Sequence, residues 1–397
     1  MVQTNHRLWT KNFFILSLVN FFLTLVFFIL IATLPAYAVD KFHASTNQAG
    51  LVGGIFVIGS LVGRLFTGRV IHSIGPKRIL MFGLIFLTFT TFLYFLDYGI
   101  TLLILSRFIH GITVGIAITV VATMVALSIP ESRKGEGISY FAVSTALATG
   151  LGPFIGIFMS QHTNFEMVLI FCLLLGVLSF TTAFFFNAPI QTNAETKHKN
   201  VGFKLSSFIE PKVLPISIIV LTMTFCFSSV LAFINLYAIE VKLVDTAGFF
   251  FMFYSASVLI SRPFTGRLMD KKGANFIMYP TFIIFGLGML LLSSASNSLT
   301  FLLAGALIGL GFGNISSIAQ AIAVNRVSPH RLGVATSTFF IFFEIGIGFG
   351  PYLIGLMIPI IGYNVLYVSL GIIIFATSIL YYCLHGKKER ANELLMA

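Results

Sequence analysis

The sequence alternates long apolar runs with short polar or charged segments. A membrane-spanning helix needs about 20 mostly apolar residues, and each run is close to or above that length. Polar turns separate neighbouring runs, for example at residues 75–78 and 130–134. The pattern predicts twelve spans, at residues 13–39, 48–71, 79–96, 99–129, 137–160, 165–187, 213–239, 247–269, 276–294, 298–325, 334–360 and 363–384.

A repeat with an offset of 198 positions relates the two halves of the chain. Residues 64–69 read Arg-Leu-Phe-Thr-Gly-Arg, and residues 262–267 read Arg-Pro-Phe-Thr-Gly-Arg. Duplicated membrane domains of this kind form parallel halves related by an axis along the membrane normal. We therefore expect an all-α membrane protein with two pseudo-symmetric six-helix bundles, at residues 1–187 and 213–397, joined by a cytoplasmic linker at residues 188–212.

Composition and charge support a membrane location. The chain is 57% hydrophobic and 9% charged, whereas soluble domains carry about 25% charged residues. Of the 24 basic residues, 19 fall on one side of the predicted spans, two on the other side and three within spans. This asymmetry follows the positive-inside rule. It predicts a multi-pass protein of the cell membrane with both termini in the cytoplasm, and it explains the net charge of +11 without a nucleic-acid partner.

Candidate gating loops follow the two copies of the repeat. They consist of Gly68, Arg69, His72, Gly75, Lys77 and Arg78 in the first half, and of Gly266, Arg267, Asp270, Lys271 and Gly273 in the second. They resemble the loop signature of the major facilitator superfamily, Gly-x-x-x-Asp-Arg/Lys-x-Gly-Arg/Lys-Arg/Lys. The resemblance implies that the Asp latches the halves together through a helix N-terminus, where negative charge is favoured. His72 stands in place of that Asp, so we expect a weaker latch in the first half.

Two further motifs strengthen the resemblance and indicate a direction of transport. Arg107 and Gly111 resemble the Arg-x-x-x-Gly pattern of span 4, and Gly152, Pro153 and Gly156 resemble the Gly-Pro-x-x-Gly pattern of efflux proteins in span 5. Together they are similar to bacterial drug-type efflux permeases of the twelve-span proton-antiporter group. That group also includes exporters of metallophores.

Three residues are candidates for proton coupling. Arg107 and His110 lie three positions apart on one helix face, and a charged residue within a span normally faces the protein interior or a wet cavity. Glu344 is the one carboxylate placed well inside a predicted span, and a buried carboxylate can bind a proton or a substrate in competition. The alternative is that all three only stabilise the bundle through hydrogen bonds or ion pairs.

Other residues have predicted structural or binding roles. Arg64 and Arg262 are repeat mates within spans, where they either reach the interface by extending their side chains or contribute to a gate. Helix packing is expected at Gly150, Gly152, Pro153, Gly348, Gly350 and Pro351, since small residues allow helices to approach closely in lipid. Candidates for a substrate cavity are the mid-span polar residues Asn20, Asn235, Asn314 and Gln320.

These features predict a secondary transporter rather than an enzyme. The sequence has no Gly-Lys-Ser/Thr loop for ATP, no metal-ligand cluster and no cofactor motif, so the proton gradient is the expected energy source. We expect a functional monomer in the lipid bilayer that exports a small organic molecule by proton antiport with alternating access. Alternatives are export of a metallophore or another anionic or zwitterionic metabolite, nutrient uptake by symport, lipid flipping, and a sensor without transport activity.

Overall fold

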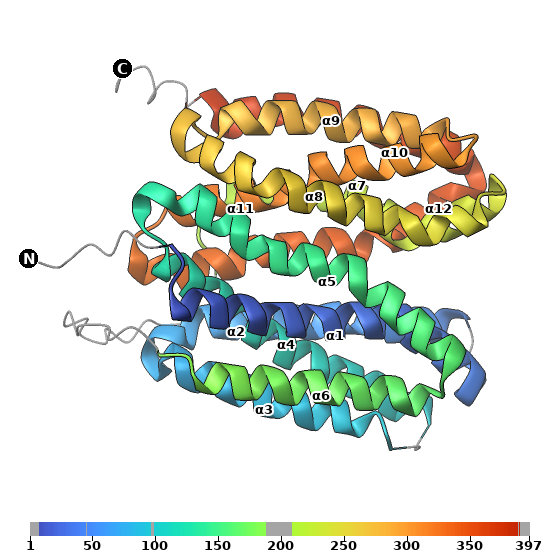
Figure 1. Ribbon diagram of the computed structural model, residues 1–397, viewed down its shortest axis with the longest axis horizontal. Helices are drawn as coiled ribbons and strands as arrows, with labels where there is room; N and C mark the ends of the chain where they lie inside the picture. The colour runs from blue at the N-terminus through green and yellow to red at the C-terminus, as the bar shows by residue number, and fades with distance from the viewer. Residues whose placement is uncertain (1–7, 45, 97–98, 188–208, 388, 390–397) are drawn as a thin grey trace, which may run out of the picture. The chain divides into compact units, whose positions relative to one another are not determined.

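The chain folds into long helices (Figure 1). The computed structural model describes residues 8–44, 46–96, 99–187, 209–387 and 389, and these residues contain no β-strand. The helices are α1 (Lys11–Phe42), α2 (Thr46–Ile74), α3 (Pro76–Leu93), α4 (Ile100–Ser128), α5 (Lys134–His162), α6 (Phe165–Phe184), α7 (Leu214–Glu240), α8 (Val244–Lys272), α9 (Asn275–Ser293), α10 (Ser298–Ile308), α11 (Asn314–Asn325) and α12 (Leu332–Tyr381). The all-helical class predicted from the sequence is confirmed.

Helix numbering and predicted spans differ at two places. A π-helical turn at Gly309–Gly313 separates α10 from α11, so both belong to one predicted span. Gly362 has non-helical backbone angles, φ 72° and ψ 168°, and divides α12 into two predicted spans. Ten segments of the described chain are long and apolar enough to cross a membrane. Together with α8 and the division at Gly362, they are consistent with twelve crossings.

The helices form two compact units. Unit 1 comprises Met1–Pro130, Ile155–Leu214 and Arg326–Ile341, and unit 2 comprises Glu131–Phe154, Pro215–Asn325 and Phe342–Ala397. Each unit thus includes a segment from the other half of the sequence. Most of the predicted linker, residues 188–208, lies outside the described residues.

Local sequence explains where several helices begin and end. The Thr10 hydroxyl accepts a hydrogen bond from the Phe13 N–H at the start of α1, and Asn297 and Thr300 form a reciprocal capping box at the start of α10. Such caps satisfy backbone donors that have no partner within the helix. Gly75 and Gly273 adopt φ angles of 94° and 80° at the turns of the two candidate gating loops, a backbone region that favours glycine.

Glycines bring α2 and α4 into contact in unit 1. A side-chain carbon on Gly59 or Gly63 of α2 would collide with carbonyl oxygens of α4, and one on Gly111 of α4 would collide with the Phe56 carbonyl of α2. In unit 2, Gly309 approaches the Tyr254 carbonyl in the same way. Small residues at helix crossings drive packing in lipid, where apolar burial contributes little. The outward faces carry exposed apolar side chains, among them Phe82, Phe86, Ile260 and Phe264.

Candidate functional site

The fully buried Arg107 is the centre of the candidate site in unit 1. None of its three guanidinium nitrogens has a hydrogen-bond partner among the described residues. Its guanidinium carbon lies 4.4 Å from the ring centroid of Phe56 on α2, within the range of a cation–π interaction. The Tyr94 hydroxyl, just beyond α3, also interacts with it electrostatically. A permanent positive charge is therefore held in an apolar interior with aromatic neighbours.

His110 lies one turn from Arg107 on the same face of α4, and it is also fully buried. The Tyr94 hydroxyl and His110 Nδ1 are hydrogen-bonded at 2.8 Å, and the His110 ring is edge-on to Phe56 at 6.0 Å. The structure thus brings the predicted pair Arg107 and His110 together with Tyr94, which sequence reasoning missed. This arrangement contains a hydroxyl and an imidazole that can exchange a proton next to a fixed cation.

A second cluster forms where the end of α8 crosses the start of α5 in unit 2. The Asp270 carboxylate accepts hydrogen bonds from the backbone N–H groups of Gly135, at 2.7 Å, and Glu136, at 2.8 Å. Such a carboxylate caps a helix N-terminus and compensates its partial positive charge. Asp270 lies one residue beyond the predicted span 247–269. Burial raises the pKa of its carboxyl, and the two N–H donors oppose that rise.

Arginines complete this crossing. The Glu136 carboxylate accepts hydrogen bonds from Nε of Arg133, at 2.6 Å, and Nε of Arg267, at 2.7 Å. Buried Arg262 donates from Nη1 to the Ser139 carbonyl and from Nη2 to the Gly313 carbonyl. The guanidinium of Arg262 therefore ties α8 to α5 and to the π-helical turn, instead of extending into the interface.

The matching crossing in unit 1 joins α2 to the start of α12. A Cβ on Gly68 would lie 2.8 Å from the Ser337 Cβ, and the Ser337 hydroxyl donates to the Arg64 carbonyl at 2.8 Å. Buried Arg64 donates from Nη1 to Thr119 and stacks its guanidinium 4.6 Å from the Phe340 ring centroid. Gly68 and Ser337 are the repeat mates of Gly266 and Ser139, so both crossings use the same small residues.

Glu210 supplies the carboxylate at the unit 1 crossing, and sequence reasoning missed it. Its carboxylate pairs with Arg331 at 2.7 Å, and its N–H donates to the Thr338 hydroxyl at 2.9 Å. Arg331 is the repeat mate of Arg133. The available signal was a single acid next to Pro211 at the end of the predicted linker, a position outside the repeat.

The remaining candidates for coupling and substrate binding are distributed over both units. Glu344 is half-buried in the part of α12 that belongs to unit 2. Asn314 is buried and fully engaged, because its amide donates to Ser261 and to the Leu310 carbonyl and accepts from Thr265. Asn20 and Gln320 are buried. Their roles in a substrate cavity stay predictions.

The predicted packing residues and loop residues have the following surroundings. A Cβ on Gly150 would lie 2.6 Å from the Ser255 hydroxyl, and Gly350 approaches Ser228. Gly152 is buried. Pro153 lies within α5, and Gly348 and Pro351 lie within α12. Lys77 donates to the Phe184 carbonyl at 3.1 Å, while Arg78 and Lys271 are exposed. The side chains of Arg69, His72 and Asn235 lie outside the described part of the structure.

No group of three or more His, Cys, Asp or Glu side chains among the described residues is placed to hold a metal ion. The polar side chains of the candidate site instead consist of a cation, an imidazole, hydroxyls and single carboxylates. Such groups can bind and release protons or bind anions, which is the chemistry of gradient-driven transport.

Comparison with known proteins connects this architecture to a family. An MFS-type transporter of Methanocaldococcus jannaschii is 26% identical over 94% of the chain and 97% of its own length. The staphylopine export protein of Staphylococcus aureus is 20% identical over 94% of the chain and 97% of its own length. The quinolone resistance protein NorA of Staphylococcus aureus is 28% identical, over 43% of each chain.

Structure and sequence profile agree with these relatives. The crystal structure of the human organic anion transporter MFSD10 superposes with a TM-score of 0.76 at 14% identity, covering 93% of this chain and 98% of that one. The Major Facilitator Superfamily profile matches residues 16–313 and 244–394. The chain is a multi-pass membrane protein, and it belongs to the Major Facilitator Superfamily of transporters.

Proposed function

We propose that this transporter exports a small organic molecule across the cell membrane by proton antiport with alternating access. The observation that carries the proposal is Arg107, a buried guanidinium without a hydrogen-bond partner beside Tyr94 and His110. An arginine in a span costs about 2.5–3.5 kcal/mol on insertion scales. The ring of Phe56 and the hydroxyl of Tyr94 compensate the charge in part. The lack of a carboxylate partner among the described residues favours a role in transport over a role in packing.

In this proposal, proton movement passes through the Tyr94–His110 pair. His110 Nδ1 shares a hydrogen bond with the Tyr94 hydroxyl, and the imidazole is the side chain best suited to accept and release a proton near neutral pH. An anion that binds Arg107 would compensate the positive charge next to His110, so that anion binding and proton uptake would be coupled. Glu344, from unit 2, is the second candidate for a group at which proton and substrate compete.

Export in place of uptake is supported by the span 5 pattern and by two relatives whose names state export or drug resistance. The distribution of the basic residues supports a cytoplasmic location of both termini. In this proposal the transporter acts as a monomer with halves at residues 1–187 and 213–397. An anionic or zwitterionic chelate is the second candidate substrate. The unpartnered guanidinium of Arg107 favours it, as does similarity to the staphylopine export protein.

Proteoliposomes with an imposed pH gradient test the proposal. Vesicles loaded with staphylopine or with a quinolone are diluted into acidic buffer, and release is compared with and without the gradient. Proton-dependent release supports export, whereas gradient-driven accumulation supports a symporter. Arg107→Met should abolish the gradient-dependent rate, and Lys41→Met, which removes an exposed lysine elsewhere, should not. Equal rates for Arg107→Met and the unmodified protein would contradict the proposed role of Arg107.

A further inference from the structure

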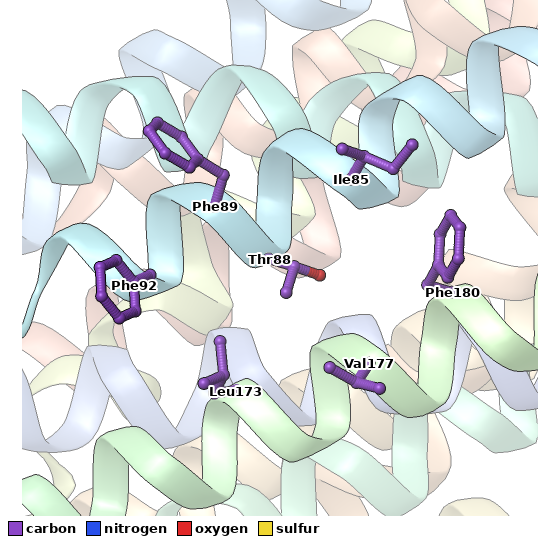
Figure 2. A pocket seen from close by; sticks show the side chains of 7 residues that line it. All are labelled: Ile85, Thr88, Phe89, Phe92, Leu173, Val177 and Phe180. Carbon is purple, nitrogen blue, oxygen red and sulfur yellow. The ribbon is translucent and has the colours of Figure 1, made fainter.

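An apolar groove of about 390 Å³ runs between α3 and α6 in unit 1 (Figure 2). Thr88 points from α3 toward α6, while Leu173 and Val177 point from α6 toward α3. Phe89 and Phe92 of α3 also line the groove. The hydroxyl of Thr88, the one polar lining residue, donates to the Leu84 carbonyl of its own helix. The groove therefore offers an apolar surface with no hydrogen-bonding requirement.

The end of the groove toward the loop after α2 carries positive charge. Lys77 donates from Nζ to the Phe184 carbonyl at 3.1 Å, and the Lys11 ammonium lies 6.0 Å from the Phe185 ring centroid. Exposed Arg78 follows Lys77 directly. A lysine ammonium has three donors, so Lys77 has two left for another acceptor. Lys77 and Lys11 therefore both contact residues at the C-terminal end of α6.

The groove and its basic end lie on one stripe of each helix. Lys77, Ile85 and Phe92 fall on one face of α3, and Val177, Phe180 and Phe184 do so on α6. At a rise of about 1.5 Å per residue, the groove begins ~12 Å from Lys77 and ends ~22 Å from it. Half of the hydrocarbon core of a bilayer is ~15 Å deep. A lipid with its phosphate at Lys77 would thus place the terminal part of one acyl chain in the groove.

The second half of the chain fills the equivalent space with its own side chains. The repeat mates of Thr88 and Val177 are Gly286 and Phe375, and a Cβ on Gly286 would lie 2.6 Å from the Phe375 ring. The mate of Lys77 is Asn275, whose amide donates to the Gly386 carbonyl and accepts from the Tyr381 hydroxyl. At these positions of the second half, the ring of Phe375 occupies the space opposite Gly286, and an asparagine replaces the lysine. The first half has both the open groove and the lysine.

We propose that the α3/α6 groove binds one acyl chain of an anionic phospholipid, whose phosphate lies against Lys77 and Lys11. Because these helices lie in a bilayer, lipid is the partner present at this face, and basic residues next to a span recognise anionic headgroups. With both termini in the cytoplasm, the lipid comes from the cytoplasmic leaflet. The site is separate from Arg107 and does not depend on which substrate is transported.

Lipid retention measured by native mass spectrometry tests this site. The delipidated protein is incubated with equal amounts of phosphatidylglycerol and phosphatidylcholine with the same acyl chains. We expect one phosphatidylglycerol to be retained preferentially. Val177→Phe places the aromatic ring of the second half in the groove and should lower retention roughly ten-fold, which corresponds to losing about two buried CH₂ groups. Leu174→Phe adds the same ring at a neighbouring exposed position and should leave retention unchanged.

Lys77→Asn introduces at the basic end of the groove the residue found at the matching position of the second half, Asn275. It should reduce the preference for phosphatidylglycerol roughly five-fold, the effect of about 1 kcal/mol per basic residue, and leave retention of phosphatidylcholine as it was. Equal retention of the two lipids by the unmodified protein would overturn the proposal, as would full retention by Val177→Phe. If Val177→Phe does not fold, as judged by size-exclusion chromatography, the unmodified protein and Lys77→Asn still decide the question.

Discussion

Replacement of Gly266 by alanine should loosen the crossing of α8 and α5 in unit 2. The added Cβ would lie 2.7 Å from the Glu136 Cα, the Gly135 carbonyl oxygen and the Ser139 Cβ. Two of these three atoms belong to the main chain, so the contact cannot be relieved by a side-chain rotation. Overpacking of this kind costs about 1–3 kcal/mol. The backbone shift should also weaken the hydrogen bonds that Asp270 accepts one turn away.

Two other glycines on α2 supply graded controls for this substitution. A Cβ on Gly54 has no atom within 4 Å, and alanine is a better helix former than glycine by about 1 kcal/mol, so Gly54→Ala should be neutral or stabilising. A Cβ on Gly68 would lie 2.8 Å from the Ser337 side chain but 3.3 Å from the nearest main-chain atom. Gly68→Ala should therefore be intermediate between Gly54→Ala and Gly266→Ala.

Thermal unfolding of the purified protein in detergent measures this order. A change of 1 kcal/mol shifts the melting temperature by about 2–4 °C in a chain of 150–250 residues and by less in a longer chain. At about 2 °C per kcal/mol, the expected loss for Gly266→Ala is roughly 2–6 °C. Transport should slow as well if the crossing opens and closes during the cycle. Should Gly266→Ala melt at the same temperature as Gly54→Ala, close packing at this crossing would not contribute to stability, and the reasoning would be refuted.

Further predictions concern the buried charges. Arg107→Met should leave the melting temperature unchanged or raise it, with a gain of up to about 1–4 kcal/mol in the free energy of unfolding, because an apolar side chain replaces a buried charge that has no carboxylate partner among the described residues. Gradient-driven transport should be lost. A lower melting temperature would assign Arg107 a structural role. Tyr94→Phe removes the partner of His110 and should cost about 1 kcal/mol and shift the pH profile of transport, and an unchanged profile would exclude this pair from the proton path. Glu210→Gln should lower stability by about 1–2 kcal/mol through loss of the ion pair with Arg331, as measured by melting; an Arg331→Gln variant with no such loss would contradict the pairing.

The helices were predictable because membrane spans depend on a one-dimensional pattern. Apolar length and polar turns are visible in the sequence, and they predicted a span at residues 247–269, which α8 contains, although α8 is not among the ten segments apolar enough to cross a membrane by themselves. The π-helical turn at Gly309–Gly313 was not predictable from the repeat. The first half has a regular helix with Gly111 and Gly115 at the matching positions. The turn contains an additional glycine, Gly311, at the position of Thr113, and Gly311 packs closely against Phe285 of α9.

Partners on other helices were the part of the site that could not be predicted. Arg107 and His110 were paired correctly on one face of α4, since three positions on a helix fix that relation. Tyr94 joins them from another segment, and its contact depends on how α3 and α4 are rotated against each other. Asn314 is a predicted substrate-cavity residue, and the structure adds that its hydrogen bonds are made to α8 and to the π-helical turn. Polarity within a span identifies such residues without showing which neighbours they bind.

The two crossings show how a duplicated fold can keep an interaction after losing the residue that made it. In unit 2, the acids are Asp270 on α8 and Glu136 on α5. Their repeat mates are His72 and Val334, so the repeat supplies no acid in unit 1. Glu210, at the end of the linker, instead pairs with Arg331. His72 predicts a weaker latch in the first half, but the crossing in unit 1 still contains an acid, Glu210. The ion pair between Glu210 and Arg331 connects the end of the linker directly to the segment before α12.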